Sequence, residues 1–399
     1  MVIIHSKKMV FLLIISALVS VHFANAGEYT VQEILEIAKQ NSGNIQVSQN
    51  FALSQKDLAL QQKYWQNPSV SFESKDGKSA TSITQTVPFP TKLQKKYSIE
   101  DAEFKILTIK ARGISLLVEV EVFSLLYKYY GISQKIELLH KRLKRLDAVS
   151  SYLSNIALNS PTKRSQANIV KAKIILIRKD LIDLENIAFQ TWNEMNTFLM
   201  LEQRPRIHTK WLKNNAVNVH NIVENATKNN LFLQEQNQLI ERFKAELAFA
   251  KVENMPDLSV SANNSSGTVG GGVGVSMPLF NRNQKKISAL QTKIKAQEAL
   301  YTFEKNKLTN QVKNVVNTYE ALHKISSSFP TLLINQILQE LSIADLDFKK
   351  NILDFITYIE LDSREYEVID VIIDTQVNIA QTYANLMLQS GNFTHPIYE

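Results

Sequence analysis

Two stretches of the chain, Ser69–Lys96 and Asp257–Lys286, share one pattern: a β-hairpin that leads through a proline into a very long helix. At the two exits Pro88 matches Pro278, and the Gln-Lys-Lys triplet that ends at Lys96 matches the one that ends at Lys286. The two copies lie about half a chain apart, much farther than the period of solenoid repeats. The sequence therefore predicts that one helix–hairpin–helix unit is used twice.

Upstream of the hairpins the same correspondence holds in a register shifted by two residues. The matched pairs are Ile34 with Ile222, Glu36 with Glu224, Ala38 with Ala226, Asn41 with Asn229 and Pro68 with Pro256. The shift falls inside the hairpins, whose loops tolerate insertions. We expect a first repeat over residues 27–202, a linker over 203–218, a second repeat over 219–391 and a short tail over 392–399.

Each predicted hairpin, over residues 69–87 and 257–277, alternates between an apolar face and a small or polar face. The apolar residues are Val70, Phe72, Ile83, Val87, Leu258, Val260, Val269, Val273, Val275 and Met277, and most residues between them are serines, threonines and glycines. The alternation is less clean in the return strand of the first hairpin, residues 80–87. Such a hairpin needs something to cover its apolar face, and two hairpins supply four strands. Closing a barrel from them requires several copies of the chain.

Residues 1–26 have the features of a signal peptide. Lys7 and Lys8 precede an apolar run that ends in Ala24-Asn25-Ala26, a pattern typical of cleavage after Ala26. A retained membrane anchor is the alternative, but the run is short for a spanning helix. Cleavage lowers the formal net charge from +7 to +5, since the segment holds two lysines and no acid. No later window has the length of a transmembrane helix, so the mature chain would enter a membrane only as a barrel.

The remaining residues predict long helices. A capping box, Thr30 to Glu33, opens a helix that runs to about Trp65, where Asn67-Pro68 ends it. A second helix follows from Pro90, and a heptad stripe marks its later part. The stripe consists of Ile132, Ile136, Leu139, Leu143, Leu146, Leu153 and Ala157, with Ser150 in the remaining position.

Ser160 as N-cap and Pro161 at the first helical position start the next helix, directly after Asn159. Its apolar stripe is Val170, Ile174, Ile177, Leu181, Leu184, Ala188, Thr191, Met195 and Phe198. Two heptad helices joined by a short turn lie antiparallel, so this turn forms a tip far from the β-hairpin. In the second repeat we expect helices over 219–254, 283–325, 331–350 and 355–388, with a second tip at Asn351–Asp354.

Charged residues give no pattern of a chemical site. The basic run His140–Arg145 and the acidic group Glu360, Asp362, Glu365, Glu367, Asp370 and Asp374 are both typical of solvated helix faces, and export disfavours a nucleic-acid partner. Five histidines outside the signal peptide are scattered, and there is no cysteine, which excludes disulfides and thiol chemistry. We therefore expect no enzymatic activity, no cofactor and no metal site.

Several motifs resemble the TolC-type outer-membrane efflux proteins. They are the opening Val31–Asn41, the helix-ending Pro68 and Pro256, the exits VPFPTKLQKK (87–96) and MPLFNRNQKK (277–286), and the ending ANLMLQSG (384–391). The resemblance covers nearly the whole mature chain. The small C-terminal extension resembles the heavy-metal and multidrug efflux branch more than protein-secretion ducts.

The resemblance implies a homotrimer in the outer membrane of a Gram-negative cell. Each chain would give four strands to one 12-stranded barrel, and the paired helices would form a periplasmic tunnel. An inner-membrane pump would supply energy through a periplasmic adaptor that docks at the tips.

Members of the family usually carry glycine at the tip turns, where this chain has Asn159 and Asn351. Asp345 and Asp347, just before the second tip, would form rings that bind cations at the entrance; a solvated helix face is the alternative.

Two other classes share the signal peptide and the heptads. A soluble periplasmic coiled-coil adaptor or scaffold would be extractable without detergent, whereas a barrel would not. A secreted pore-forming helical toxin would occur outside the cell and would need no pump. The apolar hairpin faces favour the export duct over the adaptor.

Overall fold

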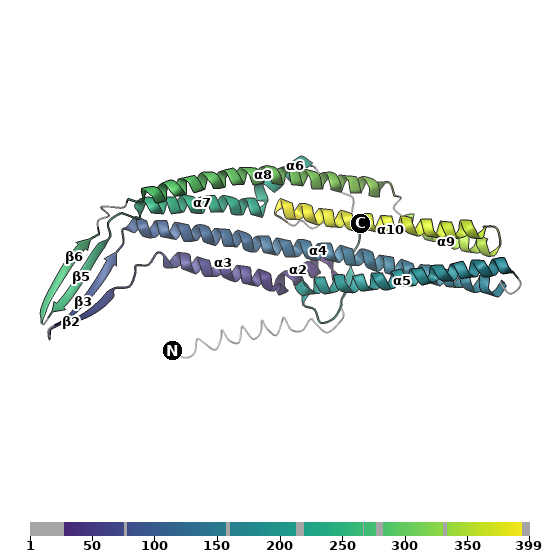
Figure 1. Ribbon diagram of the computed structural model, residues 1–399, viewed down its shortest axis with the longest axis horizontal. Coiled ribbons are helices and arrows are strands. Elements are labelled where there is room, and N and C mark those ends of the chain that lie inside the picture. The colour runs from purple at the N-terminus through teal and green to yellow at the C-terminus, as the bar shows by residue number, and fades with distance from the viewer. Residues whose placement is uncertain are drawn as a thin grey trace, which may run out of the picture.

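The computed structural model describes residues 28–75, 78–156, 160–212, 219–265, 267–276, 282–329 and 333–392. The molecule is elongated: a small sheet projects from one end of a layer of long helices, and two helical tips lie at the other end (Figure 1). The predicted signal peptide and Asn159 lie outside the described residues, as do the end of the second hairpin with Pro278 and most of the predicted tail. No described helix is long and apolar enough to cross a membrane.

The sheet joins both predicted hairpins. Strands β2 (Ser69–Lys75) and β3 (Lys78–Val87) form the first, and β5 (Leu258–Ser265) and β6 (Thr268–Val275) form the second. The strand order is β2-β3-β5-β6, and all neighbours are antiparallel. The central contact pairs Val87 with Leu258 and Ala80 with Ser265, so residues from the two halves of the chain form one continuous sheet with β2 and β6 at its edges.

The register gives the two faces of the sheet different compositions. Because side chains alternate along a strand, directly paired residues share a face. One face carries Ser69, Ser71, Glu73, Ala80, Ser82, Thr84, Thr86, Ser259, Ser261, Asn263, Gly270, Gly272 and Gly274. The other carries Val70, Phe72, Thr81, Ile83, Gln85, Val87, Leu258, Val260, Ala262, Asn264, Val269, Val273 and Val275. This second face is predominantly apolar and uncovered, with Phe72 79% exposed and Val273 72% exposed.

Helix α4 (Pro90–Ile156) is 67 residues long, on the order of 100 Å at 1.5 Å per residue. Helix α5 (Pro161–Leu199) runs back along its second half, as the two heptad stripes predict (Figure 1). The stripe residues are where the two helices pack: Leu146 and Leu153 of α4 and Val170 of α5 are fully buried. Ser160 caps α5 by accepting a hydrogen bond from Lys163 N at 3.4 Å, and Pro161 is the first helical residue.

The second half repeats this order with an interruption. Helix α8 (Gln284–Ser327) leaves the sheet, α9 (Leu333–Lys349) continues toward the tip, and α10 (Phe355–Ser390) returns. The predicted break near Ser326–Pro330 is present, because α8 ends at Ser327. Figure 1 shows α9 and α10 beside α4 and α5 at the tip end of the molecule.

One prediction is wrong in both halves: the first helix of each repeat is broken. Ser42 separates α2 (Val31–Asn41) from α3 (Gly43–Gln61), and Asn230 separates α6 (Val219–Asn229) from α7 (Leu231–Val252). The reason is tertiary. The side-chain amide of Asn41 donates to Leu199 O at 2.6 Å, and that of Asn230 donates to Gln389 O at 2.8 Å. Each break therefore satisfies a free carbonyl at the C-terminal end of a long helix.

The predicted linker contains a short strand. Strand β4 (Arg206–His208) pairs in parallel with β1 (Glu28–Thr30), which directly precedes the capping box of α2. Past this strand, Trp211 packs against Tyr130, with ring centroids 4.7 Å apart, and Tyr127 Oη donates to Lys210 O at 3.0 Å. The described part of the predicted linker, residues 203–212, thus packs through Ile207, Trp211 and Leu212 against the main apolar core.

Candidate functional site

A buried ionic cluster lies near the tips, where four helices meet. Helix α4 supplies Arg142 and Arg145, α5 supplies Lys173, α9 supplies Asp345 and α10 supplies Asp362. The Asp362 side chain is 0% exposed, and one carboxylate oxygen lies 2.6 Å from Arg142 Nη2 and 2.9 Å from Lys173 Nζ. Its other oxygen accepts from Arg145 Nη2. We call these five residues the Asp362 cluster.

Two tyrosines complete the surroundings of the cluster. Tyr358 Oη donates to Asp345 Oδ1 at 2.8 Å, and Arg145 Nη1 donates to the same oxygen at 2.8 Å. The Arg142 guanidinium lies 4.3 Å from the centre of the Tyr366 ring, in the geometry of a cation–π contact. Every charge in the cluster therefore faces an opposite charge, a hydroxyl or an aromatic ring. Such partners offset the free-energy cost of removing a charge from water.

The environment favours the ionised forms of Asp362 and Arg145, the two central charges of the cluster. Burial alone would raise the pKa of Asp362, but Arg142 and Arg145 outweigh burial and hold that pKa below its ordinary value. Burial likewise opposes the charge of Arg145, yet Asp362 and Asp345 raise its pKa. Burial raises the pKa of Tyr358, which therefore stays a neutral donor. Burial lowers the pKa of Lys173, the cluster residue on α5. The ion pairs of the cluster link α4, α5, α9 and α10.

Two sequence interpretations are corrected by this cluster. Asp362 does not lie on a solvated face, and Arg145, in the run read as solvated, is 14% exposed in its side chain. The sequence contained a usable signal: the stripe Tyr366, Ile369 and Ile373 of α10 extends backward in steps of four to Asp362 and Tyr358. An acid on an apolar stripe implies a buried partner.

The two predicted entrance carboxylates differ in their surroundings. Asp345 is engaged by Arg145 and Tyr358, and 14% of its side chain is exposed. Asp347 is half-buried, and its backbone oxygen accepts from Ile352 N and Leu353 N, which closes the tip turn. The cation-binding rings stay a prediction. Of these two aspartates, Asp345 forms an ion pair with Arg145, and Asp347 forms none among the described residues.

The second tip has the turn geometry that the sequence predicts. Asn351 has φ +61°, in the left-handed region that asparagine tolerates better than other non-glycine residues. Asp354 caps α10 by accepting from Ile356 N and Thr357 N, both at 3.0 Å. Beside this turn, Ile352 and Ile356 are 71% and 75% exposed. The tip thus presents two bare aliphatic side chains.

At the opposite end, a second ion pair joins the two hairpins at their helix junctions. Lys92 Nζ lies 2.8 Å from Asp257 Oδ1, which also accepts from Phe89 N at 3.1 Å. Pro88 follows β3, and Pro256 precedes β5, so this contact lies between two of the predicted junction prolines. Pro68 directly precedes β2. No local sequence pattern predicts this pair, because its members are 165 residues apart.

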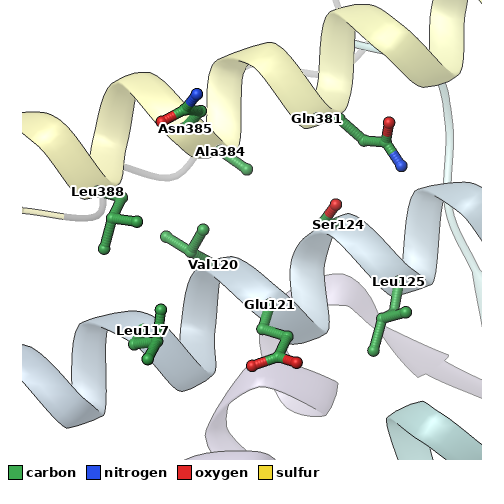
Figure 2. A pocket seen from close by; sticks show the side chains of 9 residues that line it. All are labelled: Leu117, Val120, Glu121, Ser124, Leu125, Gln381, Ala384, Asn385 and Leu388. Carbon is green, nitrogen blue, oxygen red and sulfur yellow. The ribbon is translucent and has the colours of Figure 1, made fainter. Parts of the chain in front are cut away.

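A shallow groove of about 330 Å³ lies between α4 and α10 at the middle of the molecule. Figure 2 shows Val120 of α4 directed toward Ala384 and Leu388 of α10, whereas Glu121 points to the other side of its helix. The polar groups do not converge on a point in the groove, so the geometry does not form a catalytic site. The described residues contain no group of three or more acidic or histidine side chains that could hold a metal ion.

This architecture, long helical hairpins that end in a two-faced sheet, matches solved channel structures. A structure of CusC, described in connection with transmembrane channel formation, aligns with TM-score 0.75 at 12% identity over 94% of this chain and 96% of that chain. The outer membrane protein VceC of Vibrio cholerae aligns with TM-score 0.73 at 12% identity over 91% and 96%. The open state of the MtrE outer membrane channel of Neisseria gonorrhoeae aligns with TM-score 0.73 at 11% identity over 91% of this chain and 89% of that chain.

The chain therefore has the fold of the TolC-type outer-membrane channels, and the predicted resemblance is confirmed at the level of the fold. No protein-family model matches the sequence, and no curated protein matches it. The proteins named above are described as channels or outer membrane proteins, not as enzymes.

Proposed function

We propose that this protein is the outer-membrane channel of a tripartite efflux system, a passive duct that works with an inner-membrane pump and a periplasmic adaptor. One observation carries the proposal: a four-stranded sheet with a bare apolar face and two unpaired edges stands at the end of long helical hairpins. In water such a face and such edges promote aggregation. In a membrane they fit a closed barrel.

An assembly of three copies would cover the apolar face with lipid and would pair the two free edges of each sheet. The free edges β2 and β6 of neighbouring chains would pair, and three sheets of four strands would close a 12-stranded barrel. Its apolar face would contact lipid, and its face of serine, threonine, asparagine and glycine would line water. The β6 glycines leave that inner face free of large side chains, which favours a wide passage.

The helices support the same assembly. Large aliphatic side chains stand uncovered along the outside of α5, including Ile175 at 65%, Leu176 at 61% and Ile182 at 63% exposure. Rows of this kind on a long helix need a partner helix. In a trimer each α5 would pack on a neighbouring chain, and the two proposed repeats, 27–202 and 219–391, would build a continuous helical tunnel in the periplasm.

The tips are the proposed adaptor contact. Ile352 and Ile356 provide exposed apolar area there, and Ser160 and Pro161 begin α5 at the other tip. Near this entrance the Asp362 cluster ties α9 and α10 to α4 and α5, so Asp345 would face a lumen only after the cluster rearranged. Asp347 is the better candidate for the proposed cation ring.

A soluble periplasmic scaffold would share the helices, but its sheet would not be expected to expose an apolar face to water. Transport through a duct requires no cofactor and no chemical change of the exported compound, which the pump would select. Residues 1–26 would direct the chain across the inner membrane of a Gram-negative cell.

The test is reconstitution of the purified mature chain. We expect a detergent-dependent trimer that gives stable single-channel conductance in planar bilayers, with cation block reduced by Asp347→Ala. A monomer that stays dissolved without detergent and gives no conductance would refute the proposal.

A further inference from the structure

A second groove lies where the sheet meets the helices, at the junction of α3, β3 and α4. Its volume is about 460 Å³, and its lining includes Lys63, Trp65, Val87, Pro88, Leu93 and Tyr97. Two prolines, Pro88 and Pro90, form part of its wall and have no backbone N–H to satisfy. The groove is therefore largely apolar, with one cation at its edge.

The lysine of the groove lies over an aromatic ring, and the hydroxyl of that ring, Tyr97 Oη, donates to Asp101 Oδ1 at 3.3 Å. Lys63 Nζ lies 4.1 Å from the centre of the Tyr97 ring, and no carboxylate pairs with Lys63 among the described residues. Trp65 is 57% exposed. A cation beside amphipathic rings is the composition that proteins place at the boundary between lipid headgroups and acyl chains.

The groove is continuous with the apolar face of the sheet. Val87 lines the groove and also belongs to that face, where it pairs with Leu258. Tyr64, 75% exposed, and Phe89, 43% exposed, flank the same junction. Val87 thus links the apolar face of the sheet to the groove, and aromatic side chains mark the helical end of the groove.

Basic residues surround this level of the molecule in both repeats. The exits Gln94-Lys95-Lys96 and Gln284-Lys285-Lys286 begin the two long helices. Lys286 pairs with Glu253 at 2.6 Å, whereas Lys95 and Lys285 have no ion pair among the described residues. Unpaired lysines beside a membrane surface attract anionic lipid.

We propose that this groove binds an anionic phospholipid, with the phosphate at Lys63 and the upper part of an acyl chain against Trp65 and Pro88. The chain would continue past Val87 along the sheet. This inference rests on the proposed function, because a membrane-inserted sheet places the groove at the periplasmic surface of the bilayer. It assigns to Lys63 and Trp65 a ligand that the duct itself does not require.

The exposure of the three tryptophans allows a direct test. Trp192 is 7% exposed and Trp211 is packed in the core, so quenching by a membrane probe reports mainly on Trp65. The full mature protein would be placed in vesicles that carry a minor fraction of either brominated phosphatidylglycerol or brominated phosphatidylcholine. We expect stronger quenching by the anionic lipid, lost in Trp65→Phe.

Matched variants separate the site from general attraction to the surface. Lys63→Gln should lower the preference for the anionic lipid about fivefold, the effect of one surface cation. Lys63→Arg should retain it. Lys56→Gln, an exposed lysine of α3, the helix that ends two residues before Lys63, has no ion pair among the described residues and should leave the preference unchanged. Soluble glycerophosphate should not compete.

Several outcomes would overturn the proposal. Equal quenching by the two lipids, or an unchanged preference in Lys63→Gln, would exclude a headgroup site. Competition by glycerophosphate would indicate a free-phosphate site. No quenching of Trp65 by either lipid in protein that conducts ions would mean that a second copy of the chain covers the groove. Conductance is measured in the same vesicles. Protein that conducts ions but shows no lipid preference would contradict only the lipid site, whereas protein that does not conduct would contradict the proposed channel function.

Discussion

Arg142 Nη2 lies 2.6 Å from Asp362 Oδ2, and none of the Asp362 side chain is exposed. The two residues are 220 positions apart, one on the first long helix and one on the last. Their pairing fixes α10 against α4 in one register, because a shift of either helix would leave a buried charge without its partner.

Removing the Asp362 charge should strongly destabilise the tip. In Asp362→Asn the three cations Arg142, Arg145 and Lys173 lose their shared buried carboxylate, and breaking a buried ion pair costs about 3–5 kcal/mol. We expect a lower midpoint in thermal unfolding followed by circular dichroism. Glu360→Gln is the control, since that side chain is 64% exposed on the same helix. Equal midpoints for the two variants would contradict a structural role for the cluster.

The sheet faces can be tested with two adjacent residues. Val260 points to the apolar face and Ser261 to the polar face, opposite Gly272. A lysine on the lipid side of a barrel costs from about 0–1 kcal/mol near the interfaces to about 2–4 kcal/mol at the bilayer centre, whereas the water-filled side accepts it. Val260→Lys should therefore reduce the membrane-inserted trimer, measured by fractionation and cross-linking, and Ser261→Lys should not. The same loss in both variants would argue against a lipid-facing side.

His323 should make the fold sensitive to mild acid. Its ring packs edge-on against Tyr319, with centroids 4.3 Å apart, and burial lowers its pKa from 6.5. A depressed pKa means that the neutral form stabilises the folded chain above pH 6.5 and that this contribution is lost as pH falls toward the lower folded value.

The comparison is between thermal midpoints at pH 7.5 and pH 5. We expect the wild type to lose more stability on acidification than His323→Phe, which keeps a ring against Tyr319. His140→Phe, with an exposed ring, should behave as wild type. If His323→Phe and wild type show the same pH dependence, the buried histidine makes no contribution.

The left-handed turn at Asn351 predicts a graded series. With φ +61°, Asn351→Gly should be neutral or slightly stabilising. Asn351→Val should cost about 1–2 kcal/mol, because a branched side chain clashes with the backbone there. Limited proteolysis at the tip, together with the thermal midpoint, would show the difference. A valine variant as resistant as wild type would mean that the turn adopts another conformation in solution.

The alternation of residues along the strands and the heptad spacing along the helices made much of the fold predictable. The hairpins, α4, α5, the cap at Ser160 and the turn at Asn351 all follow from local patterns, because each depends on residues within a few positions. The breaks at Ser42 and Asn230 did not follow. They exist because Asn41 and Asn230 bond to the ends of helices more than 150 residues away.

The amino-acid sequence alone determined that the chain makes two copies of a hairpin-tipped helical unit, since periodicity and proline placement act locally. Only the tertiary structure decided that the two hairpins share one sheet, that Asp362 and Arg145 are buried rather than solvated, and that Lys63 and Trp65 line one groove. These features depend on which helices lie side by side, and the burial and pairing of a charge are set by neighbours that no local pattern specifies.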